Sequence, residues 1–562
     1  MQRQKCGVIG IVMVVLTLSG CLAPGLVDTT RPSAAATVTT NKLAVPSPCT
    51  GQFTAHDLDH ITTAPGEIVR LFDSNGTGLA VGDLDGDGDM DLVLADLAGP
   101  VAIFWNQGDL VFTKTSVDLV RRARAVNLAD VDADTRLDIV LTTGRSAPIW
   151  LRNVDGANGI EFQFAPLPGV SAPAYAMNWA DLNQDGRLDL VTGSYDAGMM
   201  VEMGSNSLFA DNAGVYVYIR QPDRVAFEGH RLATKAQTLA VALEDLNQDR
   251  RPDISVGNDF DELDGYWLNA GPPSQPDWQA AMPFDTISHS TMSFDWGDVD
   301  NSGHLALFTT DMKPVSQDID TLAQWLPMIQ ESYTERPPLD PQRMENTLQV
   351  PGAGGKFQNL AYKRGMDATG WSWSGKLGDL DQDGFLDIYV VNGMIAADLL
   401  HYLPTHELVE ANQVLHNDGT GHFVPAPAWG LGSTRSGRGM SMADLDGDGD
   451  LDIVVNNLTS PAQLFENQLC GGESLLVDLR QPGTGNPFAM GTVAILHTSM
   501  GDLRRDVRVA SGYLSGDAPR LHFGFPQGTT LDRLEILWPD GTVSEIGDLS
   551  AHTLLTATRS DD

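Results

Sequence analysis

The sequence is poor in basic residues, in cysteine and in the short motifs that mark common catalytic centres. Its 562 residues include 35 Lys and Arg against 74 Asp and Glu, which gives a formal net charge of −39 at pH 7. A surface this acidic argues against nucleic acid and anionic membranes as partners. There are four cysteines, and no His-Glu-x-x-His, Cys-x-x-Cys, Gly-x-Ser-x-Gly or phosphate-binding glycine motif occurs. No catalytic residue is therefore predicted.

What the chain has instead is an acidic loop that recurs seven times, with the pattern Asp-x-Asp/Asn-x-Asp-Gly-x-x-Asp in its best copies. The clearest copy runs from Asp83 to Asp91, between two short apolar runs that are typical of strands. The other copies begin at Asp130, Asp181, Asp245, Asp298, Asp379 and Asp444. One Asp- and Gly-rich turn is common on any protein surface, but seven copies with oxygen ligands at matching offsets favour a shared ligand.

The spacing suits a hard cation. Ca²⁺ takes roughly six to eight oxygen ligands, and side chains at positions 1, 3 and 5 of a tight loop converge on one point. A glycine at position 6 permits the sharp turn, and the aspartate at position 9 closes the shell. The loop is not an EF-hand, because position 12 carries no Glu and the flanking residues alternate like strands. We therefore predict about six Ca²⁺ sites and a seventh that is weak or empty.

The copies differ in completeness. Thr135 and Arg250 replace the glycine in two loops, and Ala306 replaces the closing aspartate of the loop at Asp298, which is the site expected to be weak or empty. The predicted ligands are Asp83, Asp85, Asp87 and Asp91; Asp130, Asp132, Asp134 and Asp138; Asp181, Asn183, Asp185 and Asp189; Asp245, Asn247, Asp249 and Asp253; Asp298, Asp300 and Ser302; Asp379, Asp381, Asp383 and Asp387; and Asp444, Asp446, Asp448 and Asp452.

The repeat period indicates the architecture. Successive loops begin 47, 51, 64, 53, 81 and 65 residues apart, which fits one four-stranded antiparallel sheet per repeat. Together with strand-and-turn segments such as Val101–Gly108 and Val414–Phe423, the loops resemble FG-GAP/VCBS repeats, the blade unit of integrin-like propellers. This resemblance implies an all-β fold with a seven-bladed β-propeller over residues 48–470. Within the long irregular stretch 311–350, an apolar stripe predicts a helix that Pro327 would kink or cut short.

The first residues have the features of a targeting segment. Arg3 and Lys5 precede an apolar run that is too short to span a bilayer. Leu18-Ser19-Gly20-Cys21 resembles a bacterial lipobox, which implies a signal peptide over 1–20, lipidation of Cys21 and display on the cell envelope. An ordinary signal peptide with an incidental cysteine is the alternative. Residues 21–47, rich in Thr, Ala, Ser and Pro, are expected to form a flexible tether.

Two cysteines remain after this processing, Cys49 and Cys470. An exported chain meets an oxidising compartment, where a free pair is uncommon. One cysteine precedes the first repeat and the other follows the last, so closure of a ring would bring them together. We predict a disulfide between them, and two unrelated buried thiols remain the alternative.

Residues 471–562 contain no acidic loop and resemble the ASPIC/UnbV domain. The matching segments are Arg505-Asp506-Val507, Ser511–Ser515, Leu521–Gly524 and Ile536–Gly541, whereas Gly516 stands where a glutamine is common. The combination of repeats and domain is similar to the cartilage-acidic-protein-1-like family. That similarity implies a secreted or surface-attached Ca²⁺-binding propeller, with a small β domain after it and no catalytic residue to carry over.

Two functions stay open. The favoured one is a lipid-anchored, cell-surface binding or adhesion module for an extracellular glycan or protein, which touches a membrane only through its anchor. The alternative is a lyase-like, polysaccharide-processing enzyme, which would need a cluster of Lys, Arg, His or Tyr at one mouth of the propeller. Trp371 and Trp373 share one face of a strand, where they either form a sugar-stacking platform or pack in the core. His522 is expected to be structural.

Overall fold

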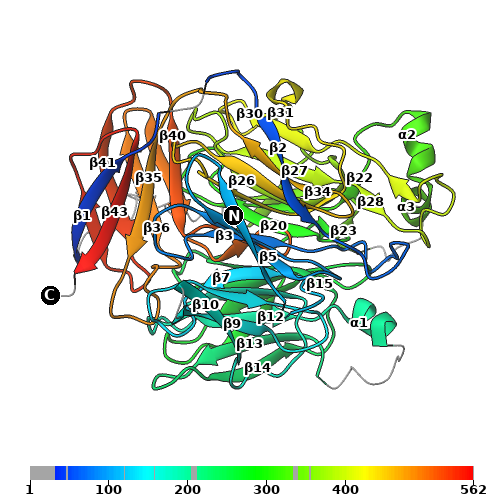
Figure 1. The fold of residues 1–562 in the computed structure, drawn as a ribbon, viewed down its shortest axis with the longest axis horizontal. Coiled ribbons are helices and arrows are strands. Elements are labelled where there is room, and N and C mark those ends of the chain that lie inside the picture. The colour runs from blue at the N-terminus through cyan, green and yellow to red at the C-terminus, as the bar shows by residue number, and fades with distance from the viewer. Residues whose placement is uncertain are drawn as a thin grey trace, which may run out of the picture.

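The computed structural model describes residues 32–45, 48–118, 120–156, 159–203, 212–332, 339–352 and 356–560. The predicted signal peptide and Cys21 lie outside these residues. In the part of the chain that is described, no helix is both long and apolar enough to cross a membrane. The fold is a β-propeller followed by a smaller β domain (Figure 1), so the predicted all-β class is confirmed.

Seven sheets of the described residues share one antiparallel order of four strands, and in each an acidic loop joins the first strand to the second. We number them in the order of the loops. Sheet 1 contains β3 (Leu79–Gly82), β4 (Asp91–Leu94), β5 (Val101–Asn106) and β6 (Phe112–Val117); sheet 2, β7 (Val126–Ala129), β8 (Asp138–Leu141), β9 (Ile149–Gly156) and β10 (Gly159–Pro166); sheet 3, β11 (Ala176–Ala180), β12 (Asp189–Gly193), β13 (Val215–Arg220) and β14 (Phe227–Ala233); sheet 4, β15 (Thr238–Glu244), β16 (Asp253–Asn258), β17 (Gly265–Asn269) and β18 (Trp278–Ala281).

The remaining sheets follow the same order. Sheet 5 contains β20 (Ser293–Gly297), β21 (Ala306–Thr310), β24 (Thr347–Pro351) and β25 (Phe357–Asn359); sheet 6, β26 (Gly370–Gly378), β27 (Asp387–Asn392), β30 (Gln413–Asn417) and β31 (Phe423–Pro425); sheet 7, β32 (Gly437–Ala443), β33 (Asp452–Asn457), β34 (Pro461–Glu466) and β2 (Thr54–Ile61). The second strand of every sheet is buried along its whole length, because neighbouring sheets cover both of its faces.

The ring closes between its two ends. β2 comes from the start of the propeller and pairs with β34 near its end, so sheet 7 is built from both. The side-chain amide of Asn106 in sheet 1 donates a hydrogen bond to the Leu445 carbonyl in the loop of sheet 7, at 2.7 Å. Four other asparagines donate in the same way to the loop of the preceding sheet: Asn153 to Leu84, Asn269 to Leu182, Asn417 to Val299 and Asn467 to Leu380.

The C-terminal domain consists of two four-stranded sheets packed on a shared apolar core. One has the order β1-β43-β35-β40 and the other β37-β36-β41-β42. Their bounds are β1 (Ala35–Lys42), β35 (Glu473–Arg480), β36 (Val493–Thr498), β37 (Gly501–Asp506), β40 (Arg520–Phe525), β41 (Leu531–Leu537), β42 (Val543–Ile546) and β43 (Thr553–Ser560).

Strand β1 corrects the sequence prediction, which assigned residues 21–47 to a flexible tether. Residues 35–42 pair antiparallel with β43 along their full length, and Figure 1 shows β1 beside β43. The prediction failed because the segment offers few apolar residues, whereas an edge strand is held by backbone hydrogen bonds that polar residues such as Thr also make. Strand β1, residues 35–42, therefore completes a sheet of the C-terminal domain.

A hairpin of the C-terminal domain lies in the centre of the propeller. Its strands, β38 (Ala510–Ser511) and β39 (Ser515–Gly516), join the sheet that contains β3. The hairpin makes backbone hydrogen bonds with the first strands of sheets 2 and 5, through Leu514 and Gly512. Gly512 has a φ of +69°, and a Cβ there would lie 2.6 Å from the Ser374 hydroxyl. The segment Ser511–Ser515 thus acts as a plug that fills the propeller axis.

The remaining elements are short. The helix predicted near Pro327 is divided into α2 (Ile319–Gln324) and α3 (Leu326–Ser332), as expected from the proline. The other described elements are α1 (Asp196–Met203), β19 (Ile287–Ser288), β22 (Met312–Lys313), β23 (Gln342–Arg343), β28 (Met394–Ile395), β29 (Glu407–Leu408) and a 3₁₀ turn at Pro427–Trp429.

Candidate metal centres

Each acidic loop joins the first strand of a sheet to the second, and its first aspartate organises the backbone. The Asp83 carboxylate accepts hydrogen bonds from the backbone N–H groups of Gly86 (2.7 Å) and Gly88 (3.1 Å). The first aspartates of the other six loops also accept two backbone N–H bonds from their own loops. A short carboxylate is suited to such local bonds. The aspartate at position 1 therefore stabilises the turn itself, in addition to any part it has in binding an ion.

Position 6 requires a left-handed backbone. Gly88 has a φ of +100° and Gly449 of +95°, which glycine adopts at little cost. Thr135 and Arg250 stand at the same place with φ of +73° and +68°. Because Thr135 is β-branched, this conformation strains its backbone. The two loops without glycine keep the turn but are less stable for it.

The aspartate at position 9 is the first residue of the second strand and ties three segments together. Asp91 accepts the N–H of Leu84 in its loop and the N–H of Asn106 on the third strand, both at 2.9 Å. The same two bonds recur at Asp138, Asp189, Asp253, Asp387 and Asp452. Closure of the loop therefore fixes the sheet behind it.

Four loops bring the carboxylates of positions 1, 3 and 9 together, with ligand atoms within 4.8 Å of one another. These are Asp83, Asp85 and Asp91; Asp130, Asp132 and Asp138; Asp379, Asp381 and Asp387; and Asp444, Asp446 and Asp452. In the described residues, the loops at Asp181, Asp245 and Asp298 form no such group of three. The reason is chemical, because position 3 is Asn183 or Asn247 in the first two and position 9 is Ala306 in the third.

Ionisation of the carboxylates in these loops is unfavourable in the folded protein without an ion. Loss of solvent, with a further contribution from neighbouring carboxylates, raises the pKa of Asp91, Asp130, Asp138, Asp181, Asp253 and Asp387 to about 7 and that of Asp444 to about 8. A bound divalent cation would favour the ionised forms and remove this cost.

The donor set fits Ca²⁺. All the predicted ligands are oxygens, which a hard cation prefers. In the loop at Asp379, Oδ1 of Asp381 is buried without a hydrogen-bond partner in the structure, although it lies in one of the convergent groups. An oxygen in this position has a lone pair to give to a cation. The four convergent carboxylate groups could therefore hold metal ions.

Arginine at position 7 divides the loops into two groups, a signal that sequence reasoning overlooked. In the loops at Asp130, Asp181 and Asp245, an arginine follows position 6 and pairs with the aspartate at position 5. The pairs are Arg136 with Asp134 (2.6 Å), Arg187 with Asp185 (3.1 Å) and Arg251 with Asp249. We call these the arginine-paired loops. The loops at Asp83, Asp379 and Asp444 have Asp89, Phe385 and Asp450 at position 7, and we call them the unpaired loops only in the sense that they carry no arginine at this position.

The third strand supplies further charges to two loops. Arg152, just before Asn153, forms an ion pair with Asp132, so the loop at Asp130 receives a second guanidinium. His416, just before Asn417, lies 3.2 Å from Asp387 and 3.5 Å from Asp381 through Nδ1. Its hydrogen bond with Asp387 raises the pKa of His416 to about 9. The residue before the asparagine therefore modulates the site, and it could have been found by aligning the repeats.

The loop at Asp298 is the least complete, as the sequence indicates. Asp300 forms an ion pair with Arg364 at 2.9 Å, and Ser302 is exposed. Position 9 offers no oxygen from its side chain, because it is Ala306. The loop still turns by the two backbone bonds to Asp298. Its carboxylates are therefore already partly neutralised by the chain.

The C-terminal domain contacts each of the unpaired loops. Arg520 donates to the Gly88 carbonyl at 3.2 Å, and the Arg505 guanidinium lies 3.9 Å from Asp379. A ring nitrogen of His522 lies 3.1 Å from the Gly449 carbonyl. Burial lowers the pKa of His522 to about 3, so this residue is neutral and structural, as expected. The two domains thus meet at acidic loops.

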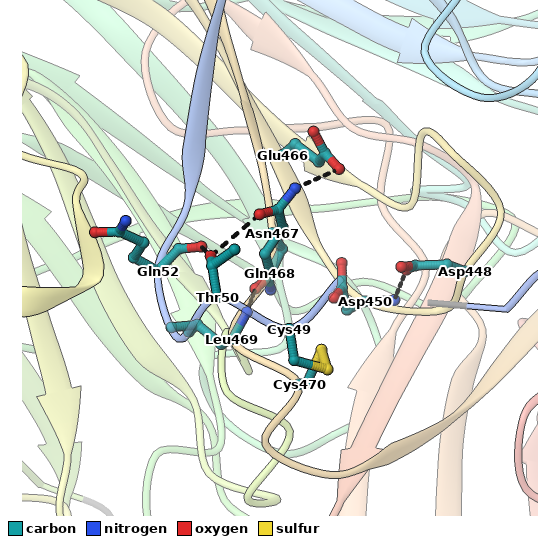
Figure 2. Close-up of a disulfide and its surroundings, with 10 residues drawn as sticks. All are labelled: Cys49, Thr50, Gln52, Asp448, Asp450, Glu466, Asn467, Gln468, Leu469 and Cys470. Atoms are coloured by element: carbon teal, nitrogen blue, oxygen red, sulfur yellow. Dashed lines mark hydrogen bonds between the residues drawn. A yellow bond between two sulfur atoms is a disulfide. The ribbon is translucent and has the colours of Figure 1, made fainter. Parts of the chain in front are cut away.

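The disulfide lies beside one of these loops. Cys49 and Cys470 are bonded across a sequence separation of 421 residues, so this prediction is confirmed. Figure 2 shows the bond near Asp448 and Asp450 of the loop at Asp444. Thr50 donates to the Gln468 side chain at 3.1 Å and fastens the same junction. The disulfide that joins the two ends of the ring therefore lies next to the acidic loop at Asp444.

Trp371 and Trp373 pack in the interior and are not a surface platform. They are 5% and 2% exposed. Trp371 lies 5.8 Å from the Trp325 ring, and Trp373 lies 5.2 Å from Tyr513 of the plug. The indole N–H of Trp373 donates to the Gly393 carbonyl. The packing alternative is the one that the structure supports.

Family comparisons agree with this architecture. The model of the ASPIC and UnbV domain matches residues 483–562, and the model of the FG-GAP-like repeat matches residues 83–141, 130–192 and 405–455. The chain matches no curated protein sequence. The repeat and the domain recognised in the sequence are therefore both confirmed.

Several solved structures align over most of the chain with low similarity. The BBS1N protein in complex with ARL6DN is 10% identical, covering 74% of this chain and 96% of that one with a TM-score of 0.40. Rhamnogalacturonan lyase YesW is 12% identical, with coverages of 74% and 76% and a TM-score of 0.35. The BP39L lectin from Burkholderia pseudomallei is 12% identical, with coverages of 70% and 96% and a TM-score of 0.41. Similarity at this level says nothing about ligand or activity.

Proposed function

Because the chain carries FG-GAP-like repeats and an ASPIC and UnbV domain, we propose that it is a calcium-stabilised binding module that holds an extracellular glycan or protein at the cell surface. We also propose that the chain is related to the cartilage-acidic-protein-1-like family. The observation that carries the proposed function is the convergence of three carboxylates in each of four loops around the ring, with the aspartate at position 9 buried in each. Each such loop ties three strands of its sheet together, so an ion there would stiffen the frame that presents a ligand.

A polysaccharide-processing enzyme is less well supported. The required cluster of basic and aromatic side chains is present near the plug, where Arg124 lies over the Tyr175 ring at 5.4 Å and Tyr175 lies 5.0 Å from Tyr195. The cavity that these residues line has a volume of about 10 Å³. That space suits about one water molecule and no sugar ring. The cluster therefore supports packing around the plug.

Display outside the cell is part of the proposal. The Cys49–Cys470 disulfide supports an oxidising compartment, since such bonds are rare where thiols are kept reduced. The lipobox-like segment ending at Cys21 would supply the anchor, and two or more acyl chains hold a protein where one is marginal. Replacement of Cys21 by Ser should release the protein from membranes. Equal membrane partitioning of the Cys21→Ser variant and the wild type would contradict the anchor.

The calcium role is tested by thermal unfolding. Extracellular sites of this kind bind with a Kd of roughly 10⁻⁴ to 10⁻³ M, so several millimolar Ca²⁺ should stabilise the fold by about 1 to 2 kcal/mol for each site. Equal ionic strength of NaCl is the control. Identical melting curves in Ca²⁺ and in excess chelator would overturn the role. A glycan array beside a depolymerisation assay separates binding from catalysis.

A further inference from the structure

The loop at Asp83 separates two neighbouring hollows on the propeller surface. The first has a volume of about 540 Å³ and lies between sheets 1 and 2, where Trp105, Thr115 and Phe162 line it. The second has a volume of about 430 Å³ and lies between the loop and the C-terminal domain, where Arg136 and Phe488 line it. Asp85 and Ile160 line both hollows. The two hollows therefore adjoin each other on either side of this loop.

Two aromatic rings from different sheets lie together in the first hollow. Trp105 of β5 and Phe162 of β10 have ring centroids 6.3 Å apart and planes inclined by 21°. Neither ring is fully buried. The indole N–H of Trp105 already donates to the Thr115 hydroxyl at 2.9 Å, so what this side chain can offer a ligand is its apolar ring. Near-parallel rings with exposed surface suit an apolar planar face.

The position of Trp105 makes this pair unlike the equivalent residues elsewhere. It stands just before Asn106, where sheets 2 and 6 carry Arg152 and His416, which contact their own acidic loops. Trp105 instead reaches Phe162 on the next sheet. The loop at Asp83 is also open to solvent, with Asp85 and Asp87 exposed, whereas the loop at Asp444 lies beneath the C-terminal domain. The hollows thus meet at the most accessible unpaired loop.

Polar groups surround the rings. Thr115 and Ser116 offer hydroxyls and Glu161 a carboxylate in the first hollow, while Arg136 and Arg480 offer guanidinium groups in the second. Carboxylates of both hollows and of the loop outnumber these two guanidiniums, even with a divalent cation counted. The surface is therefore unfavourable for an anionic chain. It fits a ligand with hydroxyl edges and an apolar face, which is the chemistry of a neutral pyranose.

We propose that the two hollows form one groove for a neutral oligosaccharide chain, with Trp105 and Phe162 holding a sugar ring and Asp85 in the wall between subsites. The inference rests on the proposed function and names the site for it. Binding of an extended chain across both hollows would contact sheets 1 and 2 and the C-terminal domain together. An ion bound in the loop at Asp83 would fix the conformation of the loop that separates the two hollows.

The test is calorimetric titration of the full chain in millimolar Ca²⁺ with cellohexaose, xylohexaose, mannohexaose and chitohexaose, and with an oligogalacturonate as the anionic comparison. At least one neutral chain should bind, and the oligogalacturonate should bind at least tenfold more weakly. Trp105→Ala should weaken the neutral ligand about tenfold. Phe164→Ala is the matched control, because Phe164 is 57% exposed on the same strand as Phe162 but lines neither hollow. It should change the Kd less than twofold.

A second variant guards against a folding defect. Glu161 is exposed, so Glu161→Arg should leave the melting temperature unchanged while its long side chain obstructs the first hollow. Failure of every neutral chain to bind overturns the groove, as does wild-type affinity in both Trp105→Ala and Glu161→Arg. Binding that neither variant affects would place the glycan elsewhere and leave the proposed function standing. A melting temperature that does not change with Ca²⁺ would instead contradict the proposed function itself.

Discussion

The unpaired loops at Asp83, Asp379 and Asp444 and the arginine-paired loops at Asp130, Asp181 and Asp245 share one backbone turn but differ in charge balance. In the second group, the aspartate at position 5 already bonds an arginine two residues later. The first group has no arginine at that place, and each of its loops contacts the C-terminal domain at one or more points. A repeated motif therefore does not imply repeated affinity, since a guanidinium competes with a cation for the same carboxylate.

The largest effect is expected at the disulfide beside the loop at Asp444. Replacing Cys49 and Cys470 by Ser opens a closed loop of 421 residues, for which chain entropy predicts a loss of about 6 kcal/mol. Denaturant unfolding of oxidised wild type and the double variant measures it. Because the bond adjoins an unpaired loop, the variant should also need more Ca²⁺ for stability. A loss below about 1 kcal/mol would show that β2 alone closes the ring.

The next effect compares one aspartate from each group. Asp444→Ala removes a carboxylate that accepts hydrogen bonds from two backbone N–H groups and that is a predicted ligand, and it should cost about 3 kcal/mol in Ca²⁺. Asp245→Ala removes two similar bonds from an exposed, arginine-paired loop and should cost less than half as much. The measurement is the free energy of unfolding from urea titrations with and without Ca²⁺. Equal losses would break the division into two groups.

Acid should affect both groups alike in the absence of Ca²⁺, because the aspartate at position 9 is buried in both. The folded pKa of Asp91, Asp138 and Asp253 is raised to about 7, above the value in the unfolded chain. The folded state therefore binds protons more tightly, and this contribution to stability is present at low pH and lost as pH rises through about 7. In chelator, the melting temperature should rise between pH 8 and pH 5.5. Millimolar Ca²⁺ should abolish the rise, and a fall in chelator would contradict the assignment.

The smallest effect concerns the strained turn of an arginine-paired loop. Thr135→Gly should stabilise the protein by up to about 1 kcal/mol, because glycine adopts the φ of +73° without a clash. Gly88→Thr in the unpaired loop is the reverse control and should destabilise it. Thermal unfolding in chelator, where no ion obscures the backbone term, is the measurement. A destabilised Thr135→Gly variant would mean that the Thr135 side chain makes a contact that outweighs the strain.

Much of the fold and of the candidate site was predictable, because the decisive signals are local. The bonds from Asp83 to Gly86 and Gly88 span at most five residues, so the turn appears directly as a spacing in the sequence. The same holds for the glycine at position 6. Cys49 and Cys470 could be paired because few cysteines remained and a ring has two ends. Arg136 was visible at position 7, but its effect on Asp134 becomes clear only when the loops are compared as geometry.

The sequence by itself determined the repeats, their acidic loops and the presence of a second β domain, since each rests on patterns within a few tens of residues. The tertiary structure alone decided that β1 completes that domain and that Ser511–Ser515 plugs the propeller. These arrangements use backbone hydrogen bonds between segments hundreds of residues apart. Such bonds need no particular side chain, so they leave no pattern in the sequence that encodes them.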